Sequence, residues 1–352
     1  MKKKSVLVYG EFSGYGKSLV KGFRHLGYKA DVLNFTGDGF KKIKGDLSLS
    51  GNNKIKKLIS LIKLIPNILK YKNILIMNPA FLNINLLGPI IIFLLKLKRS
   101  NIILLCCGDD VEFIRMGCKG MIKNWPYADI NLPYTNYYSK KSDIFIHHLT
   151  ALSVRKIIPV MYDYAYPWRL SKYKSKVTET IPLACDGSII ENISDKDKNT
   201  PITIMHGINR EDFKGSSVIK EALKIIKEKY GDNVDVIYPE KLPFNVYMEM
   251  IKSIDISIDQ TKSNSYGMNA IYSMLAGHIV LAPANDEFKN DLGINDCPVI
   301  SINNKSEDIV EKIEWILDNP SSMRELKEKT VEFAKKTHDP VKIASMISSY
   351  LI

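Results

Sequence analysis

Cysteine is scarce in this sequence, and its spacing fits neither a disulfide framework nor a zinc site. The five cysteines are an odd number, and no two of them form the C-x2-C pair typical of zinc ligands. Cys106 and Cys107 lie in the apolar run 102–107, which predicts that they are buried strand residues. A chain of 352 residues can bury two full cores, so its stability does not require disulfides. We expect reduced structural thiols, as in a cytoplasmic protein.

Long apolar runs are also missing. Residues 79–95 come nearest to a membrane span, but they include Asn83, Asn85, Gly88 and Pro89 and fall short of the ~20 apolar residues that a span needs. The basic start is followed by a short apolar run and a glycine loop, which does not match a signal peptide. We therefore expect a buried helix at 79–95 and no targeting segment.

Acidic residues are sparse in the first half of the chain. Residues 1–186 contain 30 Lys and Arg against 12 Asp and Glu, whereas residues 187–352 contain 20 against 26. This asymmetry predicts a domain boundary near residue 187 and a basic partner surface on the first half. No helix-turn-helix, zinc-finger or RNP pattern occurs, so we expect no nucleic-acid partner.

Lysine is concentrated in residues 41–72, which contain nine lysines and a single acidic residue, Asp46. From residue 54 onward, apolar residues recur between the lysines at helical spacing. One interpretation is an amphipathic helix that lies on an anionic membrane surface. The other is a core helix whose apolar stripe packs on a sheet while its lysines are solvated.

Strands and helices alternate from the start of the chain. Strand 5–9, glycine loop 10–16, a helix to His25 and strand 29–35 form the opening of a doubly wound parallel sheet. Further along, residues 142–147 are predicted to be a short strand or a buried run.

The second half repeats this organisation after a polar stretch with the composition of a linker. We predict an α/β fold of two Rossmann-like, doubly wound domains. The predicted ranges are 1–186 for the first domain, 187–200 for the linker, 201–336 for the second domain and 337–352 for a closing helix.

The glycine loop after the first strand ends in Gly16-Lys17-Ser18, as a P-loop does. A P-loop needs a glycine where this sequence has Glu11, so we do not expect a P-loop kinase or nucleoside triphosphatase. Two interpretations of Gly14 and Gly16 remain. They can let the backbone approach an anionic ligand at the helix N-terminus, or they can form a tight turn between strand and helix.

Two cations follow the first strand of the second half. His206 ends that strand, Gly207 turns the chain, and Arg210 and Lys214 come next. Guanidinium and ammonium groups can stabilise the charge that develops on a leaving diphosphate. The alternative is ordinary surface charge, and His206 is a titratable candidate beside them.

A second candidate ligand site begins at residue 254. A strand over 254–259 leads into a polar loop and then into a helix that opens at Gly267, Met268 and Asn269. The N–H groups of such a helix start can hold a phosphate. In the first half, Asp109 and Asp110 follow a strand, where they can face a ligand or cap the next helix.

These features together resemble the large retaining GT-B glycosyltransferase family, group 1 or family 4-like, whose members use nucleotide-sugar donors. The resembling residues in the second half are Lys214-Gly215 after Arg210, and Tyr266-Gly267-x-x-Ala270-x-x-x-Met274-x-x-Gly277. In the first half, 107–110 and 182–186 resemble the family more loosely. The resemblance implies two Rossmann-like domains that face a cleft, with the donor held mostly by the second domain.

Carried over by position, the resemblance implies roles for individual residues. Arg210 and Lys214 would contact the diphosphate, and the backbone at Gly267, Met268 and Asn269 would contact phosphate or sugar. The family's Glu-x7-Glu motif is replaced here by Asn264, near the donor sugar, and Tyr272, at the ribose. Gly14, Gly16 and His206 complete the expected donor-binding set. Asp109, Asp110 and Asn264 are the catalytic candidates.

The function that the resemblance implies is transfer of a sugar from a UDP-, GDP- or dTDP-sugar to a lipid-linked or polysaccharide acceptor. This belongs to surface glycan biosynthesis of the O-antigen or capsule type, on the cytoplasmic inner face of the membrane. No HExxH motif occurs, and we expect no metal and no cofactor beyond the donor. Two alternatives stay open: an inactive GT-B homologue that binds a glycan or partner, and a sugar-nucleotide epimerase or hydrolase.

Overall fold

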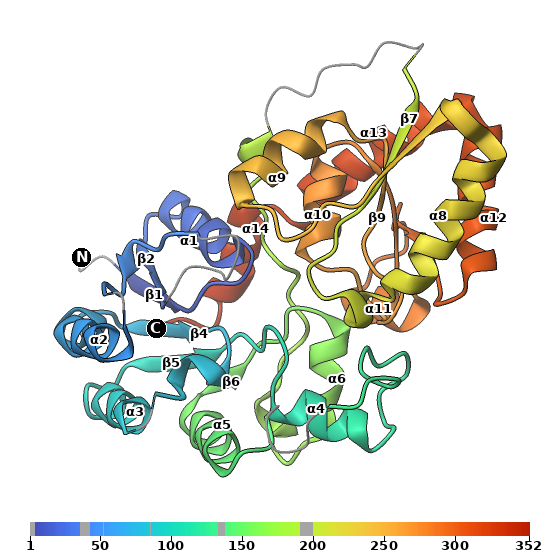
Figure 1. Cartoon of the computed structure of the whole chain (residues 1–352). Helices are drawn as coiled ribbons and strands as arrows, with labels where there is room; N and C mark the ends of the chain where they lie inside the picture. The colour runs from blue at the N-terminus through green and yellow to red at the C-terminus, as the bar shows by residue number, and fades with distance from the viewer. Residues whose placement is uncertain (1–3, 36–42, 52, 85, 133–137, 191–199) are drawn as a thin grey trace. The chain divides into compact units, whose positions relative to one another are not determined.

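A computed structural model describes residues 4–35, 43–51, 53–84, 86–132, 138–190 and 200–352 (Figure 1). The chain divides into two compact units. The first unit comprises Met1–Ile122, Leu132–Cys185 and Pro340–Ile352, and the second comprises Lys123–Asn131 and Asp186–Asp339. The chain thus passes between the units more often than the sequence-based ranges imply. Residues 123–131 belong with the second unit, and the last helix belongs with the first.

The first unit is built on a six-stranded parallel sheet with the order β3-β2-β1-β4-β5-β6. The chain moves outward from β1 in one direction and then returns to pair β4 on its other side, as in a doubly wound sheet. The bounds are β1 Ser5–Tyr9, β2 Lys29–Asn34, β3 Leu47–Ser48, β4 Asn73–Ile76, β5 Asn101–Leu104 and β6 Lys156–Ile157.

Helices cover both faces of this sheet (Figure 1). Alternate strand residues such as Leu7 and Tyr9 form one core cluster with residues of α2, α3 and α5. On the other face, α1 packs against α14, and Gly22 is required there because a Cβ would lie 1.9 Å from the Pro340 carbonyl oxygen. The bounds are α1 Tyr15–His25, α2 Lys54–Ile68, α3 Leu87–Leu97, α4 Val111–Cys118, α5 Lys141–Ser153, α6 Tyr162–Leu170 and α14 Pro340–Ser348.

One local prediction in this unit is wrong. Residues 142–147, predicted as a strand or buried run, lie within helix α5. The apolar residues there include Ile144 and Phe145, which are exposed, and Ile146, which is buried. This is a helical pattern of burial that a six-residue apolar window does not distinguish from a strand.

The second unit has a five-stranded parallel sheet with the order β11-β10-β9-β7-β8. Its first strand, β7, pairs with β8 on one side and with β9 on the other, so a topological switch point lies between β7 and β9. The bounds are β7 Ile202–His206, β8 Val234–Ile237, β9 Ile256–Ile258, β10 Ile279–Ala282 and β11 Ile300–Ser301. The helices are α7 Glu211–Lys214, α8 Ser216–Tyr230, α9 Phe244–Met250, α10 Met268–Leu275, α11 Asp286–Leu292, α12 Ser306–Asp318 and α13 Pro320–Thr337.

Both units are therefore parallel α/β structures, and the predicted fold class is confirmed. The predicted linker at 187–200 falls mostly outside the described residues. Among the helices that the structure describes, none is both long and apolar enough to cross a membrane.

Candidate functional site

The switch point of the second unit is held together by one buried lysine. The Lys214 Nζ donates to the Gly207 carbonyl oxygen, which follows β7, and to Asp259 Oδ1, which follows β9, both at 2.9 Å. Lys214 is 6% exposed and Asp259 is 2% exposed. The pair thus ties neighbouring strand ends together at the place where open α/β sheets bind ligands.

The electrostatics of this pair favour the charged state. Burial alone would raise the pKa of the Asp259 carboxyl, but the charge of Lys214 and hydrogen bonds from Lys214 and Asn269 outweigh it, so the pKa is lowered. Asp259 is thus ionised at neutral pH and neutralises the ammonium group beside it. Lys214, expected to contact a diphosphate directly, is instead a buried partner that shapes the strand ends.

Helix α10 begins at this same edge with an open N-terminus. Gly267, the N-cap residue, has no side chain to bond the first turn, and a Cβ at Gly267 would meet nothing within 4 Å. Asn269 in the first turn donates to Asp259 Oδ1 at 3.1 Å and accepts from the Tyr247 hydroxyl. The Gly267, Met268 and Asn269 region thus presents backbone N–H groups in the geometry that favours an anion.

Arg210 supplies an exposed cation in the same unit, just before α7. Its guanidinium carbon lies 3.6 Å from the centroid of the Phe213 ring, and one nitrogen donates to the Tyr127 hydroxyl at 3.1 Å. Tyr127 itself packs edge-on against Phe213. Aromatic contacts therefore orient the Arg210 side chain while leaving it accessible.

Asn264 holds the segment 123–131 within the second unit. Its side chain donates to the Lys123 carbonyl oxygen at 2.8 Å and accepts from Asn124 at 3.2 Å and Asn285 at 2.8 Å. It is 1% exposed. The amide expected near the donor sugar is thus occupied by the protein, and Asn264 has a positioning role. The sequence contains no local signal of this, because the partners lie about 140 residues away.

A polar cleft of about 410 Å³ lies at the carboxyl ends of β9, β10 and β11. Its lining is rich in amide and hydroxyl groups, among them Asn124, Thr261, Ser263 and Asn303. Lys262 in its wall lies 3.4 Å from Asp129. Its volume and lining suit a small polar ligand such as a sugar.

Two residues expected to bind the donor lie in the interior instead. Both ring nitrogens of His206 are bonded, to the Ile258 carbonyl oxygen and the Ser216 hydroxyl, and burial together with the nearby Lys214 charge lowers its pKa to about 4. Tyr272 is 0% exposed, and its ring packs against Phe244. Residues 270–275 of α10 are all buried, Tyr272 among them. Its hydroxyl is therefore not presented to a ribose.

In the glycine loop of the first unit, the carboxylate of Glu11 occupies the start of helix α1. The two Glu11 carboxylate oxygens accept from the Gly14 N–H at 2.7 Å and the Lys17 N–H at 2.9 Å. A Cβ at Gly16 would lie 2.8 Å from the same carboxylate. Gly14 and Gly16 therefore accommodate Glu11 at the start of α1, which is the position where a phosphate would otherwise bind.

Asp110 is the N-cap of α4, the alternative that its sequence position left open. Its side chain accepts from the Phe113 N–H at 2.9 Å and from the Trp168 indole N–H at 2.7 Å, and burial raises its pKa. It is 1% exposed. Asp109 is buried beside it, with its carboxylate 3.5 Å from the Tyr164 hydroxyl. Neither aspartate is an accessible base in this structure.

The sequence matches no protein-family model, and no curated protein matches it. Solved structures do match along the whole chain. Sucrose-phosphate synthase from Thermosynechococcus elongatus superposes with a TM-score of 0.62 at 12% identity, covering 99% of this chain and 98% of that one. HepE from Anabaena in complex with UDP gives 0.60 at 12% identity, covering 98% of both chains. UDP-GlcNAc 2-epimerase from Neisseria meningitidis bound to UDP-GlcNAc gives 0.51 at 11% identity, covering 98% of both. The chain thus has the GT-B fold, as the resemblance implied.

Proposed function

We propose that this protein is a glycosyltransferase that moves a sugar from a UDP-, GDP- or dTDP-sugar to a lipid-linked or polysaccharide acceptor. The observation that carries the proposal is the open N-terminus of α10 at the switch point of the second unit. It occurs in a chain whose whole length shares its fold with proteins solved with UDP or a UDP-sugar. In the first unit, by contrast, Glu11 fills the corresponding helix start.

In this proposal the donor diphosphate binds at the N–H groups that begin α10, with Arg210 as its cation. Negative charge grows on the diphosphate as the glycosidic bond breaks, and preorganised N–H dipoles and a guanidinium stabilise that charge. Lys214 acts indirectly by fixing Gly207 and Asp259. The cleft lined by amides and hydroxyls would hold the sugar. Retention of configuration at the sugar is part of the proposal.

The acceptor side of the proposal rests on the outer surface of the first unit. On α2, Ile55, Ile59 and Ile62 are exposed at 69%, 47% and 48%, at the i, i+4, i+7 spacing of one helical face. The same helix carries exposed lysines, including Lys56 and Lys63. Helix α2 packs on the sheet through other apolar residues, Leu61 and Ile68, so the three isoleucines are not part of the core.

Helix α3 extends this surface, because it covers the same face of the sheet as α2 (Figure 1). Ile90, Phe93 and Leu97 are exposed along it, and Lys96 and Lys98 flank them. Exposed apolar side chains bordered by cations are typical of a surface that docks on an anionic membrane. Such docking would suit a lipid-linked acceptor, and the location that we propose for the enzyme is the cytoplasmic inner face of the membrane.

A second candidate function is a catalytically inactive GT-B homologue that binds a glycan or partner. Two observations favour it: Asn264 is fully engaged by the protein, and Tyr272 is buried. Neither position supplies the glutamate that the family uses.

Calorimetric titration with UDP-, GDP- and dTDP-sugars tests the donor site. Wild-type protein should bind one of them, and Arg210→Ala should weaken binding by about 1.5–3 kcal/mol through loss of a charge-assisted contact. Arg324→Ala is the matched control, because Arg324 is an exposed arginine on α13 that pairs with Glu328. Equal affinity for Arg210→Ala and Arg324→Ala would remove Arg210 from the site. Absence of binding by the wild type would leave the inactive-homologue proposal.

A further inference from the structure

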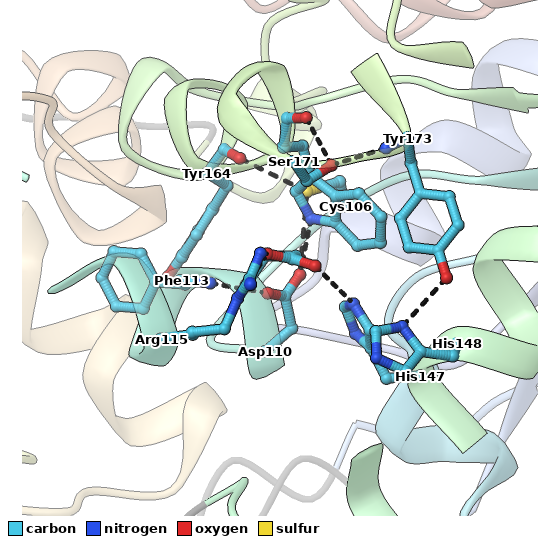
Figure 2. Close-up of polar contacts among 11 residues, drawn as sticks. Cys106, Asp110, Phe113, Arg115, His147, His148, Tyr164, Ser171 and Tyr173 are labelled. Carbon is cyan, nitrogen blue, oxygen red and sulfur yellow. Dashed lines mark hydrogen bonds and ion pairs between the residues drawn. The ribbon is translucent and has the colours of Figure 1, made fainter. Parts of the chain in front are cut away.

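Two helices of the first unit bring a carboxylate and two imidazoles together. Glu112 lies on α4, and His147 and His148 are adjacent on α5. Each offers a ligand atom, and these atoms all lie within 4.8 Å of one another. Glu112 and His147 are buried, and His148 is half-buried. Figure 2 shows the two histidines side by side near Arg115 and Asp110.

His147 is unusual among the buried histidines. Both of its ring nitrogens are buried and have no hydrogen-bond partner, and the same holds for Glu112 Oε1. His206 and His278, which are equally buried, each have both ring nitrogens bonded. Buried polar groups are almost always hydrogen-bonded, so the exception requires a cause.

The unpartnered atoms face one another. Glu112 Oε1 lies 3.7 Å from His147 Nε2, beyond hydrogen-bond range. Arg115 bonds the other carboxylate oxygen, Oε2, so Oε1 is left toward His147. Two buried polar atoms at this distance are close enough to bind the same ion.

We propose that Glu112, His147 and His148 bind a divalent transition-metal ion of the zinc type. Two imidazoles and one carboxylate are a donor set that zinc accepts, with a fourth position open to water. With bonds of about 2.1 Å, tetrahedral ligand atoms lie about 3.4 Å apart. The Glu112–His147 separation of 3.7 Å is close to this, and the His148 ligand atom lies within 4.8 Å of both.

Neighbouring side chains hold both rings in place. The Tyr173 hydroxyl lies 2.9 Å from His148 Nδ1 (Figure 2), so the metal would bind His148 through Nε2. The His147 ring stacks on Trp168 with centroids 4.8 Å apart, and Trp168 is fixed by Asp110. Such partners of the ligands orient them for a metal.

The ion would tie α4 to α5. These helices bracket residues 119–140, and within that stretch Lys123–Asn131 belong to the second unit. The metal would therefore link the helix that precedes this excursion of the chain to the helix that follows it. The competing explanation is a buried Glu112–His147 ion pair that binds no metal.

The test is a zinc titration of the metal-free full chain in competition with a chromophoric chelator. It uses a Cys118→Ser background, because Cys118 is an exposed thiol on α4 that could bind zinc by itself. We expect one zinc ion per chain and a higher melting temperature with zinc. His148→Ala should abolish both effects, and Tyr173→Phe should weaken binding about tenfold because its hydroxyl only orients the ring.

His25→Ala is the matched control, since His25 is exposed and lies outside the cluster. It should bind zinc like the parent. Circular dichroism and the metal-free melting temperature show whether His148→Ala is folded. Absence of stoichiometric binding in the Cys118→Ser protein would overturn the proposal in favour of a metal-free ion pair. Binding that is unchanged in a folded His148→Ala variant would overturn it as well.

Discussion

Replacing Lys214 by methionine should destabilise the second unit strongly, whatever the protein binds. Methionine keeps most of the side-chain volume but removes the ammonium group that contacts Gly207 and Asp259. The Asp259 carboxylate, 2% exposed, then keeps only the Asn269 donor among these contacts. Removing one member of a buried ion pair costs about 3–5 kcal/mol, because the other charge remains buried and uncompensated.

A double-mutant cycle separates this effect from loss of packing. Lys214→Met and Asp259→Asn should each be costly, while the double variant should lose about 2 kcal/mol less than their sum. The free energy of unfolding is measured in urea at neutral pH. Lys220→Met is the control, because the Lys220–Glu211 pair is exposed and its loss should cause no measurable change.

A cost of less than about 1 kcal/mol for Lys214→Met, or two single effects that simply add, would contradict this prediction. Either result would mean that the pair is solvated in solution. Lys214 could then contact a ligand directly, as the resemblance implied.

Substitutions of Glu11, His206 and Ile59 test three further features of the structure. Glu11→Ala should cost about 1–2 kcal/mol of stability, because the first turn of α1 loses its carboxylate acceptor, and should leave nucleotide affinity unchanged. A loss of affinity would restore the glycine loop as a ligand site. Folded His206 stays neutral down to about pH 4, whereas an ordinary histidine protonates below about 6.5, so stability should fall as pH drops through this window. The slope from this residue reaches about 1.4 kcal/mol per pH unit, and urea unfolding of His206→Gln should show a flatter profile than wild type. Ile59→Ser should reduce co-sedimentation with anionic vesicles several-fold, whereas Ile225→Ser, at a similarly exposed position on α8, should not. Equal effects of the two substitutions, or vesicle binding that is insensitive to salt, would contradict the docking surface.

Local sequence pattern was enough to predict the fold class. Apolar strands, glycine turns and amphipathic helices alternate with the right periods, and the structure has two parallel sheets in the predicted halves. The Asp110 cap and the Glu11 carboxylate at α1 also have local signals, because their backbone partners lie three to six residues away. For Asp110 the N-cap was one of the two interpretations that its position after a strand left open.

The site was less predictable because its decisive contacts are distant in sequence. The Asp259 partner of Lys214 lies 45 residues away, and Asn264 is engaged by a segment from the first half of the chain. Without these partners, a lysine after a glycine turn cannot be distinguished from a free phosphate ligand. Tyr272 shows a second reason: the sequence of α10 does not reveal that residues 270–275 are buried on all sides of the helix.

The most direct test of the proposed function is sugar-nucleotide turnover with and without acceptor. The substrates are radiolabelled UDP-, GDP- and dTDP-sugars, with a polyprenyl-pyrophosphate-linked glycan in anionic vesicles as acceptor. Label should move to the lipid fraction only when the acceptor is present, and Arg210→Ala should reduce this transfer while Arg324→Ala does not. Donor binding with no transfer under any condition would contradict the proposed function, as would sugar release or epimerisation that proceeds equally without acceptor.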